Sequence, residues 1–185
     1  MFKVKTEQEL ENFAKIAIEP LEGGLGHTLG NSLRRVLLTA LEGAAVTSVK
    51  IEGVLHQFST LDGVLEDVIE IILNIKKIRV KLPSDKGIKL TLKASGKKGI
   101  KAKDFEIEGD GEVVNGDTHI ATLTDTKSKL NMELNCEKGK GYSLAEERKL
   151  NEIGVISGDA LFTPVVGANY SVEPTRVGRS TDFDK

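Results

Sequence analysis

The stretch Gly26-His27-Thr28-Leu29-Gly30-Asn31-Ser32-Leu33-Arg34-Arg35-Val36-Leu37-Leu38 carries most of the information about the fold. Its apolar residues recur at helical spacing, which predicts an amphipathic helix with one broad stripe on the core side. The stripe consists of Leu25, Leu29, Leu33, Val36, Leu37, Ala40 and Leu41. Thr28 is the expected N-cap, and Gly43 is the expected stop after Glu42.

The opposite face of this predicted helix carries Asn31, Arg34, Arg35, Leu38 and Glu42. A leucine between arginines and an asparagine, directed away from the core, suggests a protein-binding face. The alternative is a solvated surface with one exposed leucine, and residue types alone favour it because single exposed apolar residues are common.

Six stretches, in order along the chain, resemble one family. They are Ile18–Leu38, Ile51–Thr60, Glu66–Lys76, Gly139–Tyr142, Phe162–Val165 and Thr175–Lys185. In these stretches the sequence resembles the alpha subunit of bacterial-type DNA-directed RNA polymerase. A match that runs over nearly the whole chain is far more specific than any single motif.

The resemblance implies a split dimerisation domain, residues 1–42 and 165–185, with a β-rich antiparallel domain inserted at 43–164. It also implies a non-catalytic role in DNA-templated transcription. In this family, two copies dimerise and form the platform for the two large catalytic subunits. No cofactor is expected.

The same resemblance assigns interface residues. The family's contacts to the large subunits match Arg35 and Leu38, with Arg34 and Asn31 beside them. Further candidates for that interface are Glu70, Lys76, Arg176 and Arg179. The dimerisation stripe comprises Leu25, Leu29, Leu33, Leu37 and Leu41.

Family members continue beyond the segment Thr181–Lys185 with a strand and a long helix, and then with a linker and a small DNA-binding domain. This sequence stops at Lys185. The expectation is therefore a leucine stripe that is incompletely covered, and no direct contact of this segment with nucleic acid.

The rest of the chain predicts two sections of secondary structure. The first contains a strand at 13–18 that ends before Pro20, strands at 46–51 and 54–58, and a helix at 62–77 with Asp62 as N-cap. After this helix the hydrophobic pattern has period two, which predicts antiparallel strands at 78–82, 88–93, 105–108, 119–123 and 130–136. A polar loop is expected at 139–157, with a helical turn at 145–150, and an edge strand at 170–177. Together these elements indicate an α+β fold.

Composition sets broad limits. Hydrophobic residues at 39% and charged residues at 29% are typical of a soluble globular protein, and the net charge is −2. Cys136 is the single cysteine, which excludes an internal disulfide and agrees with a reducing cytoplasm. The chain has no signal-peptide pattern and no apolar run long enough to span a bilayer. A cytoplasmic location without membrane partners is expected.

A basic block raises a rival function, a stand-alone nucleic-acid-binding module that uses residues 76–103. That block holds eleven lysines and arginines and one acidic residue, whereas residues 104–117 hold six acidic residues and no basic ones. Aromatic residues are scarce at 4%. If the strands are neighbours, Lys89 and Lys93 can pair with Glu106 and Glu108, so a solvated sheet surface is favoured.

The sequence does not predict a catalytic or metal site. His27, His56 and His119 are scattered, and none has a metal-ligand spacing with Cys136. The carboxylates Asp62, Glu66, Asp67 and Glu70 lie on or beside one predicted helix, without partners from elsewhere. Residues 23–26 are glycine-rich before a helix, but they lack the lysine of a phosphate-binding loop. A small enzyme that uses His27 is the third option, although a histidine at a helix start is the more common explanation.

Overall fold

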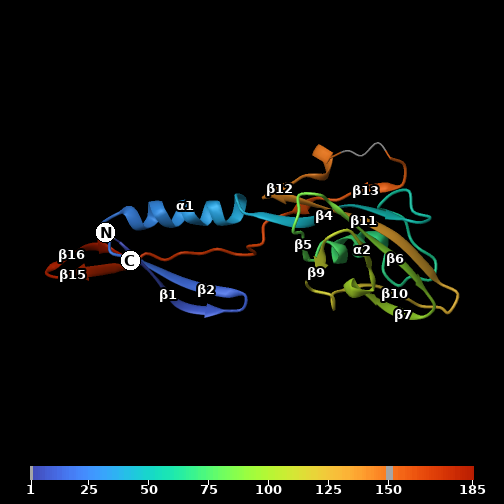
Figure 1. The fold of residues 1–185 in the computed structure, drawn as a ribbon, viewed down its shortest axis with the longest axis horizontal. Coiled ribbons are helices and arrows are strands. Elements are labelled where there is room, and N and C mark those ends of the chain that lie inside the picture. The colour runs from blue at the N-terminus through green and yellow to red at the C-terminus, as the bar shows by residue number, and fades with distance from the viewer. Residues whose placement is uncertain (1, 149–151) are drawn as a thin grey trace. The chain divides into compact units, whose positions relative to one another are not determined.

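The structure, a computed structural model, describes residues 2–148 and 152–185 (Figure 1). The fold is α+β, with mostly antiparallel strands and two α-helices. It divides into two compact units, Met1–Leu38 with Val165–Lys185, and Thr39–Pro164. We call these the split unit and the insert unit. The sequence-based boundaries were 42/43 and 164/165.

The split unit combines elements from both ends of the chain. Strands β1 (Lys3–Leu10) and β2 (Phe13–Glu19) form an antiparallel hairpin in which Leu10 lies opposite Phe13. Short strand β3 (Leu21–Glu22) leads into helix α1 (Leu25–Thr39). Strands β15 (Pro174–Val177) and β16 (Ser180–Asp184) join β3 in a three-stranded sheet of order β15-β16-β3.

Helix α1 begins before the N-cap expected at Thr28, and it ends three residues before Glu42, the last helical residue that the sequence predicts. Thr28 is not the N-cap but lies inside the helix, where its carbonyl accepts a hydrogen bond from Ser32 Oγ at 2.8 Å. Asp184 Oδ2 instead accepts from the backbone N–H groups of Gly24 at 2.8 Å and Gly26 at 3.1 Å. A carboxylate from a distant strand thus satisfies the free donors at the helix start.

The C-terminal end of α1 is set by strand pairing. Ala40 and Leu41 lie outside the helix, and Glu42 already belongs to strand β4 (Glu42–Ile51), where it pairs with Lys140. Gly43 is therefore a strand residue and not a helix stop. A Cβ atom on Gly43 would overlap with the carbonyl oxygen of Phe162, so the two ends of the insert unit meet at a position that admits only glycine.

The insert unit is built on a five-stranded antiparallel sheet of order β13-β4-β11-β6-β8. Its other strands are β13 (Val155–Ser157), β11 (Lys129–Lys140), β6 (Ile88–Ser95) and β8 (Glu106–Glu108). In β6 and β11, buried apolar residues alternate with polar ones, as one covered face requires. Helix α2 (Val68–Ile75) contributes Val68, Ile71, Ile72 and Ile75 to the same core as Leu90 and Leu134.

Short elements complete the insert unit. Strand β7 (Lys98–Lys101) pairs with β10 (His119–Leu123), β5 (Val80–Lys81) with β9 (Glu112–Val113), and β12 (Tyr142–Ser143) with β14 (Ala160–Leu161). Two 3-10 helices, η1 (Ala102–Asp104) and η2 (Ala145–Arg148), lie between them. The expected helical turn at 145–150 begins as η2, and its last two residues lie outside the described residues.

The start of α2, the strand at 54–58 and the last edge strand differ from what the sequence predicts. Helix α2 begins after Asp67, which is the N-cap and accepts from the Glu70 N–H at 2.7 Å, so Asp62 has no capping role. Val64, expected in the helix, instead forms a β-bridge with Leu123. Residues 54–58 form turns and not a strand, because Val54 donates back to the Ile51 carbonyl at 3.1 Å. The edge strand expected at 170–177 is shorter and is β15.

Candidate functional site

The predicted protein-binding residues of the first helix lie together on α1. Asn31, Arg34, Arg35 and Leu38 have the spacing i, i+3, i+4 and i+7, which places them along one side of the helix. Asn31, Arg34 and Arg35 are exposed, and Leu38 is half-buried. We call these four residues the arginine face.

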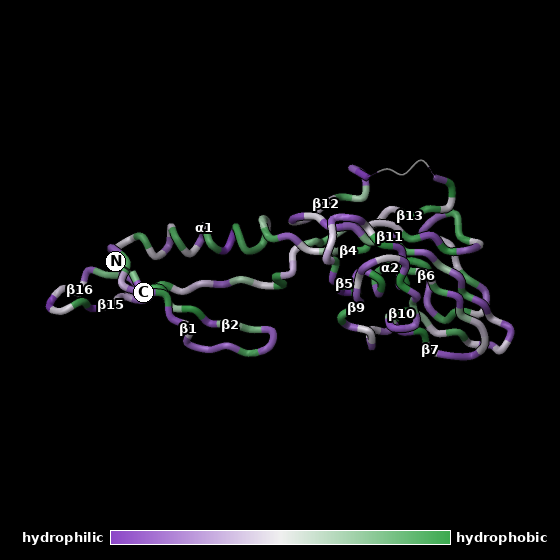
Figure 2. The backbone as a smooth tube through the Cα atoms, in the orientation of Figure 1, coloured by the Kyte–Doolittle hydropathy of each residue, from purple (hydrophilic) through white to green (hydrophobic). Residues whose placement is uncertain are grey.

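The leucine stripe of α1 does not fill a core within this chain. Leu25, Leu33 and Leu37 keep exposed fractions of 45%, 40% and 40%, and Leu29 is half-buried. Leu41 lies beyond the helix and is half-buried in the insert unit. In Figure 2 hydrophobic and hydrophilic residues alternate along α1, as an amphipathic helix requires. The role of the stripe in dimerisation stays a prediction.

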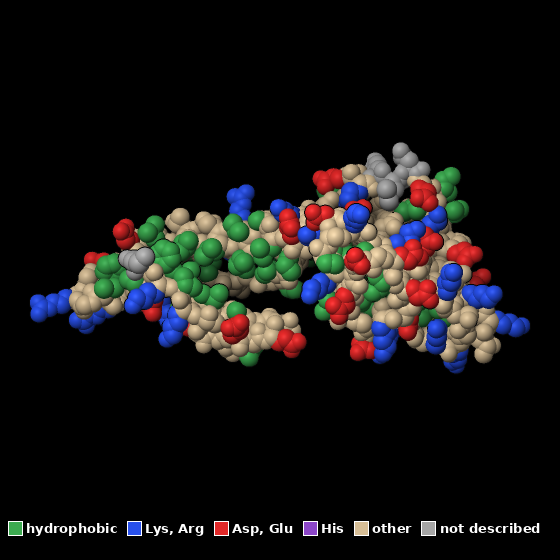
Figure 3. All heavy atoms as spheres, in the orientation of Figure 1, with side chains coloured by type: hydrophobic (Ala, Val, Ile, Leu, Met, Phe, Trp, Pro, Cys, Tyr) green, Lys and Arg blue, Asp and Glu red, His purple; other side chains and the backbone are tan. Residues whose placement is uncertain are grey.

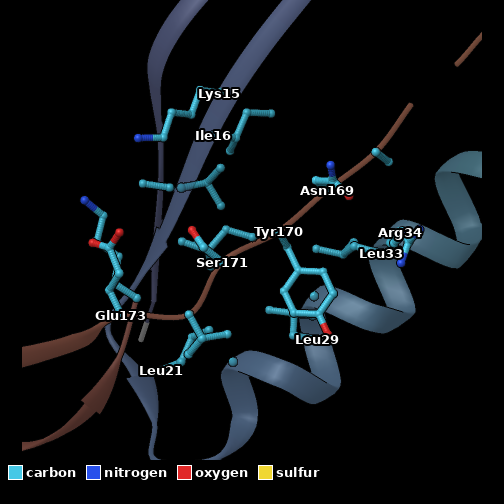
Figure 4. Close-up of a pocket in the computed structure, with 18 of the residues that line it drawn as sticks. Lys15, Ile16, Leu21, Leu29, Leu33, Arg34, Asn169, Tyr170, Ser171 and Glu173 are labelled. Carbon is cyan, nitrogen blue, oxygen red and sulfur yellow. The ribbon is translucent and has the colours of Figure 1, made fainter. Parts of the chain in front are cut away.

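One segment of the split unit covers part of the stripe. The ring of Tyr170 lies over α1 beside Leu29 and Leu33 (Figure 4). A Cβ atom on Gly30 would overlap with this ring, so the glycine allows the close approach. The His27 ring meets Tyr170 edge-on, with ring centroids 6.1 Å apart. His27 thus packs at the start of the helix.

A hollow of about 450 Å³ lies between the β1–β2 hairpin, α1 and residues 168–173. Its walls are mainly apolar and include Val4, Ile16, Leu21, Leu29, Leu33 and Leu37. Glu7 closes one side of this hollow and holds ion pairs with Lys15 at 2.8 Å and Lys185 at 2.7 Å. These hydrogen-bonded ammonium groups lower the pKa of Glu7 to about 2.

The split unit leaves an unusual amount of apolar surface uncovered. Among its described residues, only Ala17 and Leu21 are buried hydrophobic residues. Its exposed large hydrophobic residues are Phe2, Val4, Leu10, Phe13, Ile16, Leu25, Leu33, Val36, Leu37, Val166, Tyr170 and Val177. Figure 3 shows hydrophobic side chains gathered over α1. Apolar surfaces of this extent are typical of interaction sites for proteins, membranes or ligands.

Two further predicted interface residues of the split unit, Arg176 and Arg179, lie apart from the arginine face. Arg176 and Arg179 are exposed on the β15–β16 hairpin, and Arg176 Nε donates to the Gly178 carbonyl at 2.7 Å. That hairpin contacts the N-terminal end of α1 through Asp184, whereas Leu38 lies in the last turn of the helix.

Glu70 and Lys76 belong to the insert unit. Glu70 is exposed in the first turn of α2, and Lys76 is the C-cap of that helix. Lys76 Nζ lies 3.8 Å from Asp159 Oδ2. Asp159 also accepts from the Ala145 N–H at 2.9 Å, and this bond together with one from Tyr142 holds the pKa of Asp159 below its ordinary value.

A second polar cluster fixes the segment that precedes α2. Glu66 accepts from the Thr122 N–H at 2.6 Å, from Thr122 Oγ1 at 3.0 Å, and lies 2.7 Å from His119 Nε2. Burial opposes its charge, but the hydrogen bonds from His119 and Thr122 hold the pKa of Glu66 below its ordinary value. This cluster ties the segment before α2 to β10 and provides hydrogen-bond donors for the half-buried carboxylate.

The expected cross-strand pairs are only partly formed. Lys89 lies opposite Glu108 in the ladder, but its Nζ contacts Glu133 at 3.3 Å, while Thr91 Oγ1 donates to Glu108 at 3.4 Å. Lys93 lies opposite Asn131 and not opposite an acidic residue. The prediction for Lys93 was wrong because β11, and not the acidic strand β8, flanks its position.

The other candidates for chemistry stay separate. His56 Nδ1 lies 3.2 Å from Ser59 Oγ, and Cys136 lies in the core, where burial raises the pKa of its thiol to about 12. Within residues 2–148 and 152–185, no group of three or more His, Cys, Asp or Glu side chains could hold a metal ion. In that same part of the chain, no helix has the length and hydropathy needed to cross a membrane.

Several contacts that hold the split unit together could not be predicted from the sequence. Asp184, Glu7 and Lys185 connect the two ends of the split unit, but each looks like an ordinary surface charge in the sequence. Tyr170 was placed in an edge strand, and its contact with Gly30 depends on a pairing 140 positions apart. Gly30 lies within an otherwise helical pattern, and a glycine at such a position is consistent with the close approach of another segment.

Comparison with known proteins identifies relatives for nearly the whole chain. Residues 49–163 match the family model described as the RNA polymerase Rpb3/RpoA insert domain. The chain is 50% identical to the DNA-directed RNA polymerase subunit alpha of Oenococcus oeni, over 98% of its length, and 51% identical to that of Desulforamulus reducens, over 99%. Identity to the subunit of Herpetosiphon aurantiacus is 46% over 100%. The chain spans 59%, 58% and 56% of these three relatives.

Proposed function

The chain belongs to the family of the RNA polymerase Rpb3/RpoA insert domain, and we propose that it is an assembly part of a DNA-directed RNA polymerase. The relatives that match it over nearly its whole length are alpha subunits of that enzyme. In this proposal the chain has no active site or cofactor of its own, works in the cytoplasm, and contributes by holding other subunits.

The uncovered apolar surface of the split unit is the observation that carries the proposal. Leu33, Leu37 and Val36 on α1 keep exposed fractions between 40% and 51%, next to an apolar hollow. Burying such side chains contributes roughly 1.5–3 kcal/mol each. We infer that a second copy of the chain covers the leucine stripe, so that the subunit forms a two-fold dimer.

The arginine face provides the surface for the large catalytic subunits. Arginines are enriched among residues that contribute most to interface energies, since their fork of donors can bind carboxylates or carbonyls. Four further exposed residues extend the set of candidates for the same partners, namely Glu70, Lys76, Arg176 and Arg179.

Binding to the large subunits tests the arginine face. We expect Arg35→Ala to weaken capture of the purified large subunits by tenfold or more, which corresponds to about 1.4 kcal/mol. Lys86→Ala, which removes an exposed positive charge from a turn of the insert unit, should leave capture unchanged. Circular dichroism of both variants controls for folding. Unchanged capture by folded Arg35→Ala protein would contradict the assignment.

Self-association tests the leucine stripe separately. Light scattering should show that the chain associates, and Leu33→Asp combined with Leu37→Asp should shift it towards the monomer. The control is Leu55→Asp, which alters a leucine of the insert unit that is 72% exposed. A monomeric parent chain, or equal effects of both changes, would contradict dimerisation through α1.

A further inference from the structure

Seven of the described basic residues of the insert unit have an acidic partner within 4 Å. Lys50 pairs with Glu152, Lys89 with Glu133, Lys101 and Lys103 with Asp117, and Lys138 with Asp85 and Glu42. Among the described lysines of this unit that have no such partner, five exposed ones lie close together in the fold. They are Lys93, Lys97, Lys98, Lys127 and Lys129, which we call the lysine cluster.

The fold brings the lysine cluster together from two neighbouring connections. One connects β6 to β7, and the other connects β10 to β11. The Gly96 N–H donates to the Ser128 carbonyl at 3.0 Å, Lys129 lies opposite Ser95, and Lys98 lies opposite Leu123. In Figure 3 lysine and arginine side chains project from the end of the insert unit where β6, β7, β10 and β11 run in Figure 1.

The backbone that carries the lysine cluster is fixed by hydrogen bonds and close packing. Ser128 is buried with an exposed fraction of 8%, and a Cβ atom on Gly63 would overlap with its hydroxyl group. The Thr124 N–H donates to the Gly63 carbonyl at 3.0 Å, and the Ser128 N–H donates to the Asp125 carbonyl at 3.2 Å. The lysines therefore extend from a backbone that is fixed on both sides.

The two connections themselves carry more positive than negative charge. Residues 93–98 and 123–129 contain five lysines and one acidic residue, Asp125. The contact with Gly63 adds Asp62, which is also exposed. Five positive charges against two negative charges leave a local excess on a chain whose overall net charge is −2. Such an excess attracts polyanions over distances of about a Debye length.

We propose that the lysine cluster contacts the phosphate backbone of double-stranded DNA. Lysine acts as a point charge towards phosphate, and phosphate contacts hold a duplex without reading its sequence. The choice of DNA as the polyanion rests on the proposed function in a DNA-directed polymerase. This surface overlaps with the basic block at 76–103, which supplies Lys93, Lys97 and Lys98, but it also draws Lys127 and Lys129 from outside that block. Lys89, Lys101 and Lys103 of the block are not part of the cluster, because they form ion pairs with Glu133 and Asp117.

The composition of the two connections favours DNA over an acidic protein. The exposed residues at 93–98 and 124–129 are lysine, serine, glycine, threonine and aspartate, while Ala94 is buried. Protein–protein interfaces are enriched in aromatic residues, methionine and arginine, and they are depleted in lysine. The cluster has none of the enriched types, so its surface matches a phosphate backbone better than a folded partner.

The test measures binding of the chain to a fluorescent 30-base-pair duplex by anisotropy over a range of salt concentrations. The variant Lys97→Gln/Lys98→Gln/Lys127→Gln should bind at least tenfold more weakly at low salt, and its log–log salt slope should fall by about 2 to 3. The control Lys5→Gln/Lys81→Gln/Lys86→Gln removes the same charge from exposed lysines elsewhere and should bind within twofold of the parent.

Three results would overturn the proposal. They are no binding to the duplex at about 50 mM salt, equal losses in the cluster variant and the control, and tighter binding of polyglutamate than of DNA, which would indicate an acidic protein partner. Capture of the large subunits by the cluster variant is measured in parallel. Since the cluster lies outside the arginine face, normal capture with no DNA binding would reject this inference and leave the proposed function intact.

Discussion

Asp184 accepts a hydrogen bond from the backbone N–H of Gly26, 158 positions earlier in the chain, at 3.1 Å. The same carboxylate oxygen accepts from Gly24 at 2.8 Å. The last strand of the split unit therefore determines where its helix begins. The start of α1 depends on this long-range cap, since the helix lacks an acidic residue in its own first turn.

Removing the cap should destabilise the start of α1. We expect Asp184→Ala to lower the free energy of unfolding by about 0.5–2 kcal/mol, the usual cost of a lost N-cap. Hydrogen exchange of the Gly24 and Gly26 amides should accelerate at the same time. Asp182→Ala, two residues earlier on the same strand, is the control. Equal effects of the two changes would show that strand charge, and not the cap, matters.

The contact between Gly30 and Tyr170 predicts a strong steric effect. Gly30→Val would place side-chain atoms inside the Tyr170 ring and should cost about 1–3 kcal/mol, as overpacking does elsewhere. Thermal unfolding followed by circular dichroism measures the loss. Gly167→Val is the matched control, because no atom lies within 4 Å of a Cβ built there. A Gly30 variant as stable as this control would contradict the observed packing.

The lowered pKa of Glu7 predicts that the stability of the folded chain decreases in acid. Its pKa is lowered from 4.5 to about 2 in the folded chain by hydrogen bonds from Lys15 and Lys185. The ion pairs therefore contribute stability above pH 4.5, and this contribution is lost as the pH falls towards 2. An NMR titration of the Glu7 carboxyl carbon should give a midpoint near 2, and Lys15→Gln should raise it. A midpoint near 4.5 in the parent would contradict the ion pairs.

Truncation of Leu134 and of Leu33 should lower the stability of the chain by different amounts. Leu134 is fully buried in the insert unit, so Leu134→Ala should cost about 2–5 kcal/mol. Leu33 was expected in the core from the sequence, but it keeps an exposed fraction of 40%, so Leu33→Ala should cost less in a dissociated chain. Chemical denaturation at low protein concentration compares them. Equal losses would mean that Leu33 is buried in a way that this chain alone does not show.

The secondary structure of the insert unit was easier to predict than that of the split unit, because apolar and polar residues alternate along its strands. The patterns at 88–93, 119–123 and 130–136 correspond to strands β6, β10 and β11, because burial of one sheet face imposes period two on the sequence. Strand β1 escaped prediction since it is exposed over its whole length, and its sequence KVKTEQEL shows no apolar alternation. Helix α2 was predicted too long because an apolar run at 64–65 continues the helical pattern into a β-bridge.

Only those parts of the candidate site that lie within one short segment of the sequence could be predicted. The spacing of Asn31, Arg34, Arg35 and Leu38 follows from helix geometry, and so the arginine face could be found in the sequence. The cap from Asp184 and the lysine cluster depend on pairings between distant segments. No window of the sequence contains that information, and the boundaries of α1 shifted for this reason.

The contact between Gly43 and Phe162 has a consequence for how such a chain can vary. The residues at which the chain enters and leaves the insert unit lie against each other. Joining two ends that already touch needs only a short link and little loop entropy. A gene could therefore gain, lose or exchange the coding segment for residues 44–161 as one block, provided that the glycine at the junction is retained.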